Sequence, residues 1–150
     1  MLEQLVFHDK TIDITLSEAA SQQSLQLESI LLIEIQVYFS CLLSKRLAFY
    51  SEQAFEGTWQ LSADELSTVL ENAQQLTNKI YIRFNTVMTK TCSVSDVIGP
   101  PPVTDFAIKN LKPYVPSWLN IDYQGVKWSG QYGWKASDKN NTNTKQIRSA

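Results

Sequence analysis

The chain has 150 residues, of which 43% are hydrophobic and 19% are charged. This length suits one domain, and the composition excludes a disordered or collagen-like chain. Thirteen basic residues against fifteen acidic ones give a net charge of −2, which argues against a protein that binds polyanions through bulk charge. We expect one globular domain over 1–134, followed by a polar basic tail, 135–150, that is flexible unless bound.

Two short apolar stretches near the N-terminus, Leu5–Phe7 and Ile12–Ile14, flank His8-Asp9-Lys10. Alternation in the second stretch predicts a strand, and the pair predicts a hairpin.

A first long helix is predicted from Thr15 to about Tyr50, a stretch without Gly or Pro. Thr15-Leu16-Ser17-Glu18 fits a capping box, in which a hydroxyl and a carboxylate satisfy the first helical amides. Apolar residues then recur at helical spacing: Leu27, Ile30, Leu31, Ile35, Tyr38 and Leu42. A strand is the alternative for 31–40, where β-branched and aromatic residues alternate with Glu34 and Gln36. The Leu-, Ala- and Gln-rich flanks favour the helix.

A second long helix is predicted from Ser62 to about residue 90. Ser62-Ala63-Asp64-Glu65 fits another capping box, and apolar residues follow at spacings of three and four. The alternative ends this helix near Asn78 and begins a strand at Ile80, because 80–84 also alternates. With 51–61 as the linker, the two helices would form an antiparallel pair.

All five prolines and four of the five glycines fall between Gly99 and Gly133. They predict extended chain at Gly99–Pro102, a short helix at 105–111, and a hairpin of aromatic-rich strands over 118–123 and 126–134. The expected fold class is therefore α+β: two long antiparallel helices with a small antiparallel sheet built from the N-terminal strands and the C-terminal hairpin.

The sequence lacks the residues that phosphate binding, nucleophilic catalysis and zinc binding usually require. No phosphate-binding glycine motif or nucleophile elbow is present, and His8 is the single histidine. With one His and the distant Cys41 and Cys92, a zinc site is not expected, and no cofactor is predicted. The two cysteines are interpreted as buried thiols, and together with the lack of a secretory signal they predict a cytoplasmic protein. The run 30–43 is too short for a membrane span and contains Glu34.

Six large aromatic residues crowd into the C-terminal part of the chain: Tyr114, Trp118, Tyr123, Trp128, Tyr132 and Trp134. They fit three roles: closing the core of a small sheet, forming a partner surface, or stacking on bases or sugars beside Lys127, Lys135 and Arg148. We take these six residues as the candidate partner-binding residues.

Glu34 is the most informative acid because it interrupts an apolar run. If buried, it would be suited to acid or base chemistry in a pocket with Tyr38, Arg83 and Tyr123. The alternative places it on a polar stripe with Gln36 or Lys45.

The leading hypothesis is a non-enzymatic protein-interaction module: an accessory subunit, an adaptor, or an immunity-like inhibitor that acts on a protein partner or on a second copy of the chain. Missing catalytic motifs and an aromatic, proline-rich C-terminal part motivate it. One alternative is a small-molecule binding domain or carboxylate-using enzyme with the Glu34 pocket. Another is weak single-stranded nucleic-acid binding through the tail and the aromatic residues, although the net charge argues against it.

Overall fold

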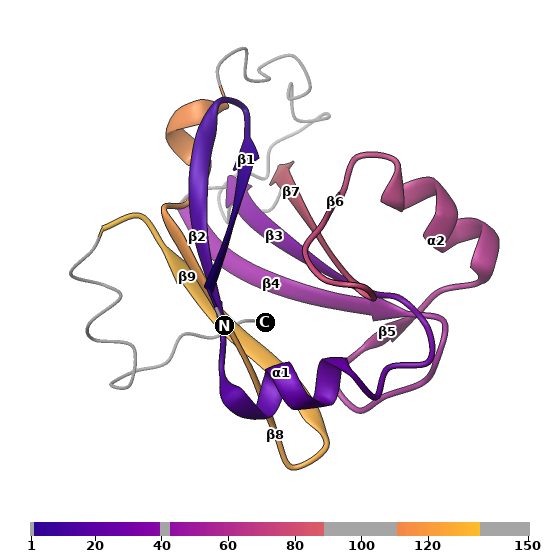
Figure 1. Ribbon diagram of the computed structural model, residues 1–150. Helices are drawn as coiled ribbons and strands as arrows, with labels where there is room; N and C mark the ends of the chain where they lie inside the picture. The colour runs from indigo at the N-terminus through magenta and orange to yellow at the C-terminus, as the bar shows by residue number, and fades with distance from the viewer. Residues whose placement is uncertain (1, 40–42, 89–110, 136–150) are drawn as a thin grey trace.

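The computed structural model describes residues 2–39, 43–88 and 111–135. Those residues form two β-sheets and two short helices (Figure 1). One sheet has four strands in the order β1-β2-β8-β9, and the other has five strands in the order β5-β4-β3-β7-β6. In chain order the elements are β1 Leu2–Phe7, β2 Lys10–Leu16, α1 Glu18–Ser24, β3 Leu31–Phe39, β4 Leu43–Ser51, β5 Trp59–Gln60, α2 Ala63–Leu70, β6 Gln74–Gln75, β7 Ile80–Met88, the 3₁₀ turn Lys112–Tyr114, β8 Trp118–Gln124 and β9 Lys127–Gly133.

The core lies between the two sheets. Alternate residues of β2, β8 and β9 meet alternate residues of β3, β4 and β7 in a single hydrophobic cluster, which includes Ile12, Ile14, Leu119, Ile121, Trp128, Ile33, Ile35, Leu47, Phe49 and Ile82. This is the inward half of a period-two pattern, as expected for two sheets packed face to face. In Figure 1, α1 crosses one end of this sandwich beside β8, and α2 lies to the side of the five-stranded sheet.

The predicted α+β fold with two long antiparallel helices is wrong. The stretch predicted as the first long helix contains the end of β2, then α1, β3 and β4. The second predicted helix is real only as far as Leu70, and β7 begins at Ile80. β3 is the central strand of its sheet, between β4 and β7. Its inner residues face the core, and Leu32, Glu34 and Gln36 on its other face are buried as well. A strand buried on both faces reads as a continuous apolar run, which resembles a buried helix.

The helix starts were predicted with mixed success. Ser62 and Glu65 form the expected capping box, each side chain bonding the other's backbone N–H. The cap predicted at Thr15 is wrong, because Thr15 lies in β2 and the helix begins after Ser17, whose hydroxyl accepts from the Ala20 N–H.

Both predicted hairpins are present, β1–β2 and β8–β9. They do join in one sheet, but β2 and β8 pair in parallel, so the sheet is not the antiparallel one that was expected. Outside the described residues lie Cys41, Cys92, Gly99–Pro102, the tail from 136, and the short helix predicted at 105–111 except for its last residue.

Candidate functional site

The structure brings Glu34, Arg83 and Tyr38 onto one face of the five-stranded sheet, the face turned away from the core. Glu34 and Arg83 are register partners on β3 and β7, and their Oε2 and Nη1 atoms lie 2.8 Å apart. The Gln36 amide donates to Glu34 Oε1 at 2.5 Å and lies 3.4 Å from the Tyr50 hydroxyl. Glu34 is only 3% exposed, so this is a buried polar network.

The charge of Glu34 is compensated within this network. Arg83 is close to Oε2 but outside hydrogen-bonding geometry, so the two groups pair through charge and Gln36 supplies the aligned hydrogen bond. Burial raises the pKa of Tyr50, and the nearby carboxylate of Glu34 adds to the shift, while the Gln36 hydrogen bond opposes it. Tyr38 accepts from Arg46 Nη1 at 2.8 Å. Glu34 is therefore buried, as the pocket hypothesis required, and it is paired with Arg83 and Gln36 within the chain.

The six C-terminal aromatic residues divide into two groups. Trp118, Trp128 and Tyr132 are each no more than 3% exposed, so their rings are covered within the chain. The half-buried residues are Tyr114, Tyr123 and Trp134. Trp128 and Tyr132 belong to the core cluster, which is the first of the roles considered for these residues.

Tyr132, on β9, forms hydrogen bonds that link the four-stranded sheet to the five-stranded sheet. Its hydroxyl donates to the Gln36 carbonyl at 2.5 Å, and the Lys45 ammonium donates to the Tyr132 carbonyl at 2.8 Å. Burial raises the pKa of the Tyr132 phenol far above its ordinary value, partly offset by the backbone N–H of Arg46. The phenol therefore stays protonated and acts as a structural donor.

His8 sits in the two-residue turn between β1 and β2. His8 and Asp9 have φ values of 51° and 67°, the pattern of a type I′ turn made without glycine. The imidazole packs edge-on against Phe84, with ring centroids 5.8 Å apart. His8 therefore lies at an exposed hairpin tip and contacts Phe84.

Another feature, which sequence reasoning missed, is a groove of about 500 Å³ along the free edge of β4. β4 supplies Arg46 and Phe49, β5 supplies Trp59, and β9 supplies Lys127 and Trp128. Trp59 is 60% exposed at this groove. The available signal was a tryptophan in a polar, glycine-containing stretch, 56–60, which the helical interpretation treated as a linker.

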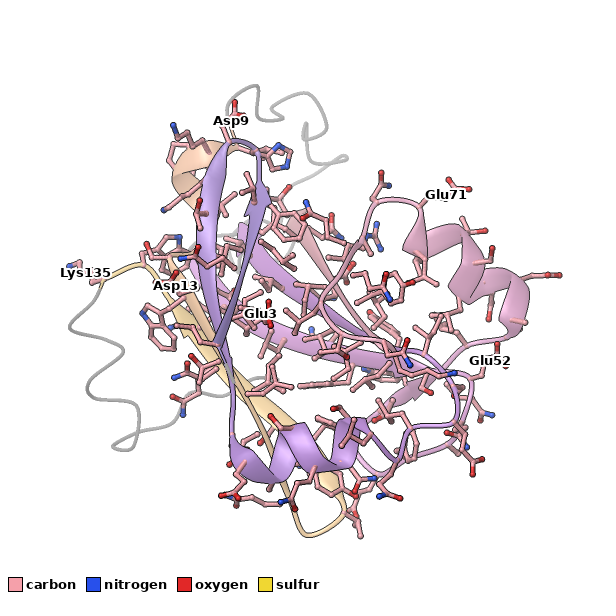
Figure 2. All side chains as sticks on the ribbon, in the orientation of Figure 1. Glu3, Asp9, Asp13, Glu52, Glu71 and Lys135 are labelled. Carbon is pink, nitrogen blue, oxygen red and sulfur yellow. The ribbon has the colours of Figure 1, made fainter. Side chains whose placement is uncertain are left out.

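The groove is locally basic in an acidic chain. Its lining contains Arg46 and Lys127 and no Asp or Glu, whereas the whole chain has a net charge of −2. Two of the acidic side chains lie away from the groove in Figure 2, Asp9 at the β1–β2 tip and Glu71 at the end of α2, whereas the exposed Glu56 precedes the lining residue Gly57. The aliphatic stem of Lys127 packs over Gly57, where an added Cβ would meet its Cε at 3.0 Å. Gly57 has a φ of 81°, so a glycine is favoured there by backbone conformation as well.

Other types of site find no support in the described residues. Across 2–39, 43–88 and 111–135, no three His, Cys, Asp or Glu side chains gather to hold a metal ion. None of the helices in that part of the chain is long and apolar enough to cross a membrane. Comparisons with protein-family models, with curated proteins and with solved structures found no match.

Proposed function

We propose that this protein is a non-enzymatic interaction module that engages a protein partner at the groove beside β4. The observation that carries the proposal is the groove itself: it pairs an exposed Trp59 with Arg46 and Lys127 on its lining. Tryptophan and arginine are the residues most often found at the energetic centre of protein interfaces.

The groove replaces the aromatic cluster as the proposed binding surface. Trp118, Trp128 and Tyr132 are used within the chain, whereas Trp59 is open to solvent. A groove of about 500 Å³ also falls in the size range of small-molecule sites. Its lining, however, lacks the converging titratable groups that catalysis requires, with Arg46 already bound to Tyr38.

The Glu34 network gives the alternative function less support. Neither Glu34, Tyr38 nor Arg83 lines this groove. The carboxylate is paired with Arg83 and hydrogen-bonded by Gln36, so a ligand would have to displace both.

The experiment is affinity capture from native lysate with matched baits. The wild-type chain and the control Leu25→Ala, whose side chain is 83% exposed and lies outside the groove, should both recover one protein near one-to-one. Trp59→Ala and Lys127→Glu should lose it, because each removes a contact at the groove. Recovery of the bait alone from all four, or equal recovery of the same protein by all four, would contradict the proposal.

A further inference from the structure

The edge of β4 that borders the groove carries backbone groups directed away from β3. The Leu31 N–H donates to the Lys79 carbonyl at 2.8 Å, so the Leu31 peptide groups face β7. The peptide groups of its antiparallel partner Ser51 therefore point away from β3. The Leu61 N–H donates to the Ser51 carbonyl at 2.9 Å. Because backbone direction alternates along a strand, Leu47 shares the outward direction of Ser51.

β5 covers only part of that edge. It is in register with Tyr50 and Ser51 and ends there. Within the described part of the chain, no strand is in register with Leu47 on the outward side of β4. No backbone hydrogen bond from a loop or turn there reaches the outward N–H and C=O of Leu47. Leu47 lines the groove. Unpaired peptide groups of a strand edge are a ready template for a further strand.

The opposite wall of the groove is also a strand edge. A two-residue turn, Gly125-Val126, joins β8 to β9, so Gln124 and Lys127 form the hydrogen-bonded pair that closes it. The next residue, Trp128, then directs its peptide groups away from β8. β9 is the last strand of its sheet, and Trp128 lines the groove. Two strand edges, one from each sheet, therefore border the same groove.

We infer that the groove binds an extended, acidic peptide segment of the partner, which adds to β4 as a strand in line with β5. This inference rests on the proposed function and names the class of partner. Backbone pairing would come from Leu47, charge pairing from Lys127, and side-chain packing from Trp59. Addition of a peptide strand to a sheet edge draws affinity from main-chain hydrogen bonds and specificity from the flanking side chains.

Charge complementarity selects an acidic segment. The lining carries two cations and no acid, so it attracts carboxylates and repels Lys-rich segments. Neither cation forms an ion pair within the described ranges, and Lys127 is the one of the two assigned to charge pairing, because Arg46 donates to the Tyr38 hydroxyl. A small anion would satisfy the cations but would leave the Leu47 peptide groups unused, which is why an extended peptide fits better.

The test uses the full chain and a fluorescein-labelled eight-residue peptide of alternating Val and Glu, followed by fluorescence anisotropy at low salt. The peptide should bind saturably and weaken as salt is added. Lys127→Glu should weaken it at least tenfold, whereas Lys127→Arg, which keeps the charge, should bind like the wild type. Trp59→Ala, a change at an exposed side chain, should also weaken it.

Three further probes separate the possible occupants. An alternating Val and Lys peptide should not bind. The Val and Glu peptide N-methylated on alternate residues, so that one edge loses its N–H donors, should bind at least tenfold more weakly. Citrate should compete only weakly. Equal binding of the N-methylated peptide, displacement by citrate as effective as by the unlabelled peptide, self-association of the chain that blocks binding, or no binding at all would overturn the inference.

The two proposals fail separately. If the groove variants still lose the captured partner while the acidic peptide does not bind, the interaction function stands and the strand-addition inference is wrong. If neither the partner nor the peptide depends on Trp59 and Lys127, both are wrong.

Discussion

Removing the positive charge of Arg83 should destabilise the protein strongly, because it leaves the buried carboxylate of Glu34 without its counter-charge. The Nη1 and Oε2 atoms are 2.8 Å apart. At an effective dielectric constant of about 20, this separation corresponds to about 6 kcal/mol of gross attraction, much of it offset by desolvation. Breaking a buried pair by removing one partner costs about 3–5 kcal/mol. Since the Arg83 side chain is 22% exposed, Arg83→Met should lower the free energy of unfolding by about 3 kcal/mol, the lower end of that range.

A double-mutant cycle isolates the charge. Glu34→Gln in the Arg83→Met background removes the uncompensated carboxylate and keeps an oxygen that accepts from Gln36. The double variant should therefore be more stable than Arg83→Met alone, with a coupling energy of at least about 1.5 kcal/mol. Urea unfolding followed by tryptophan fluorescence gives each free energy of unfolding. A loss below about 0.5 kcal/mol for Arg83→Met, or simple additivity of the two changes, would refute the reasoning.

Three other perturbations test separate parts of the fold by the same unfolding measurement. Asp9→Gly should raise the free energy of unfolding by about 1 kcal/mol, because φ is 67° there; a loss would show that the Asp9 side chain matters more than backbone strain. Ser62→Ala should lower it by about 1 kcal/mol by removing the cap of α2, while an unchanged value would mean that the cap adds nothing. For Tyr132, burial raises the pKa in the folded state above the unfolded value near 10, so wild-type stability should fall with rising pH above about 10, by up to about 1.4 kcal/mol per unit. Tyr132→Phe should be less stable at neutral pH and should show a shallower decline, and equal slopes would contradict this.

The sequence predicted local features better than long elements. The Ser62 capping box and the two hairpins depend on neighbouring residues, and they are where they were expected. β3 was misassigned because its assignment depends on what covers its second face. Leu32, Glu34 and Gln36 are buried there beside β4 and β7, which no local pattern specifies. The strand alternative for 31–40 used the right signal, the alternation of β-branched residues.

The candidate site was less accessible to sequence reasoning. The pairing of Glu34 with Arg83 requires the parallel register of β3 and β7, although both residues had been singled out. The groove requires β4 and β9, from different sheets, to border the same space. Trp59 and Lys127 are 68 positions apart in the chain and meet only through that arrangement. The backbone also approaches closely at Gly130, where an added Cβ would meet the Asn120 carbonyl at 2.6 Å.

The most direct test of the groove as the binding surface is site-specific photocrosslinking in native lysate. Replacing Trp59 by p-benzoylphenylalanine keeps an aromatic ring at the groove, and the same replacement of Leu25 serves as the control at an exposed position elsewhere. The account predicts one dominant crosslinked partner from position 59, attached through an acidic stretch, and none from position 25. Identical crosslinks from both positions, or none from position 59, would contradict it.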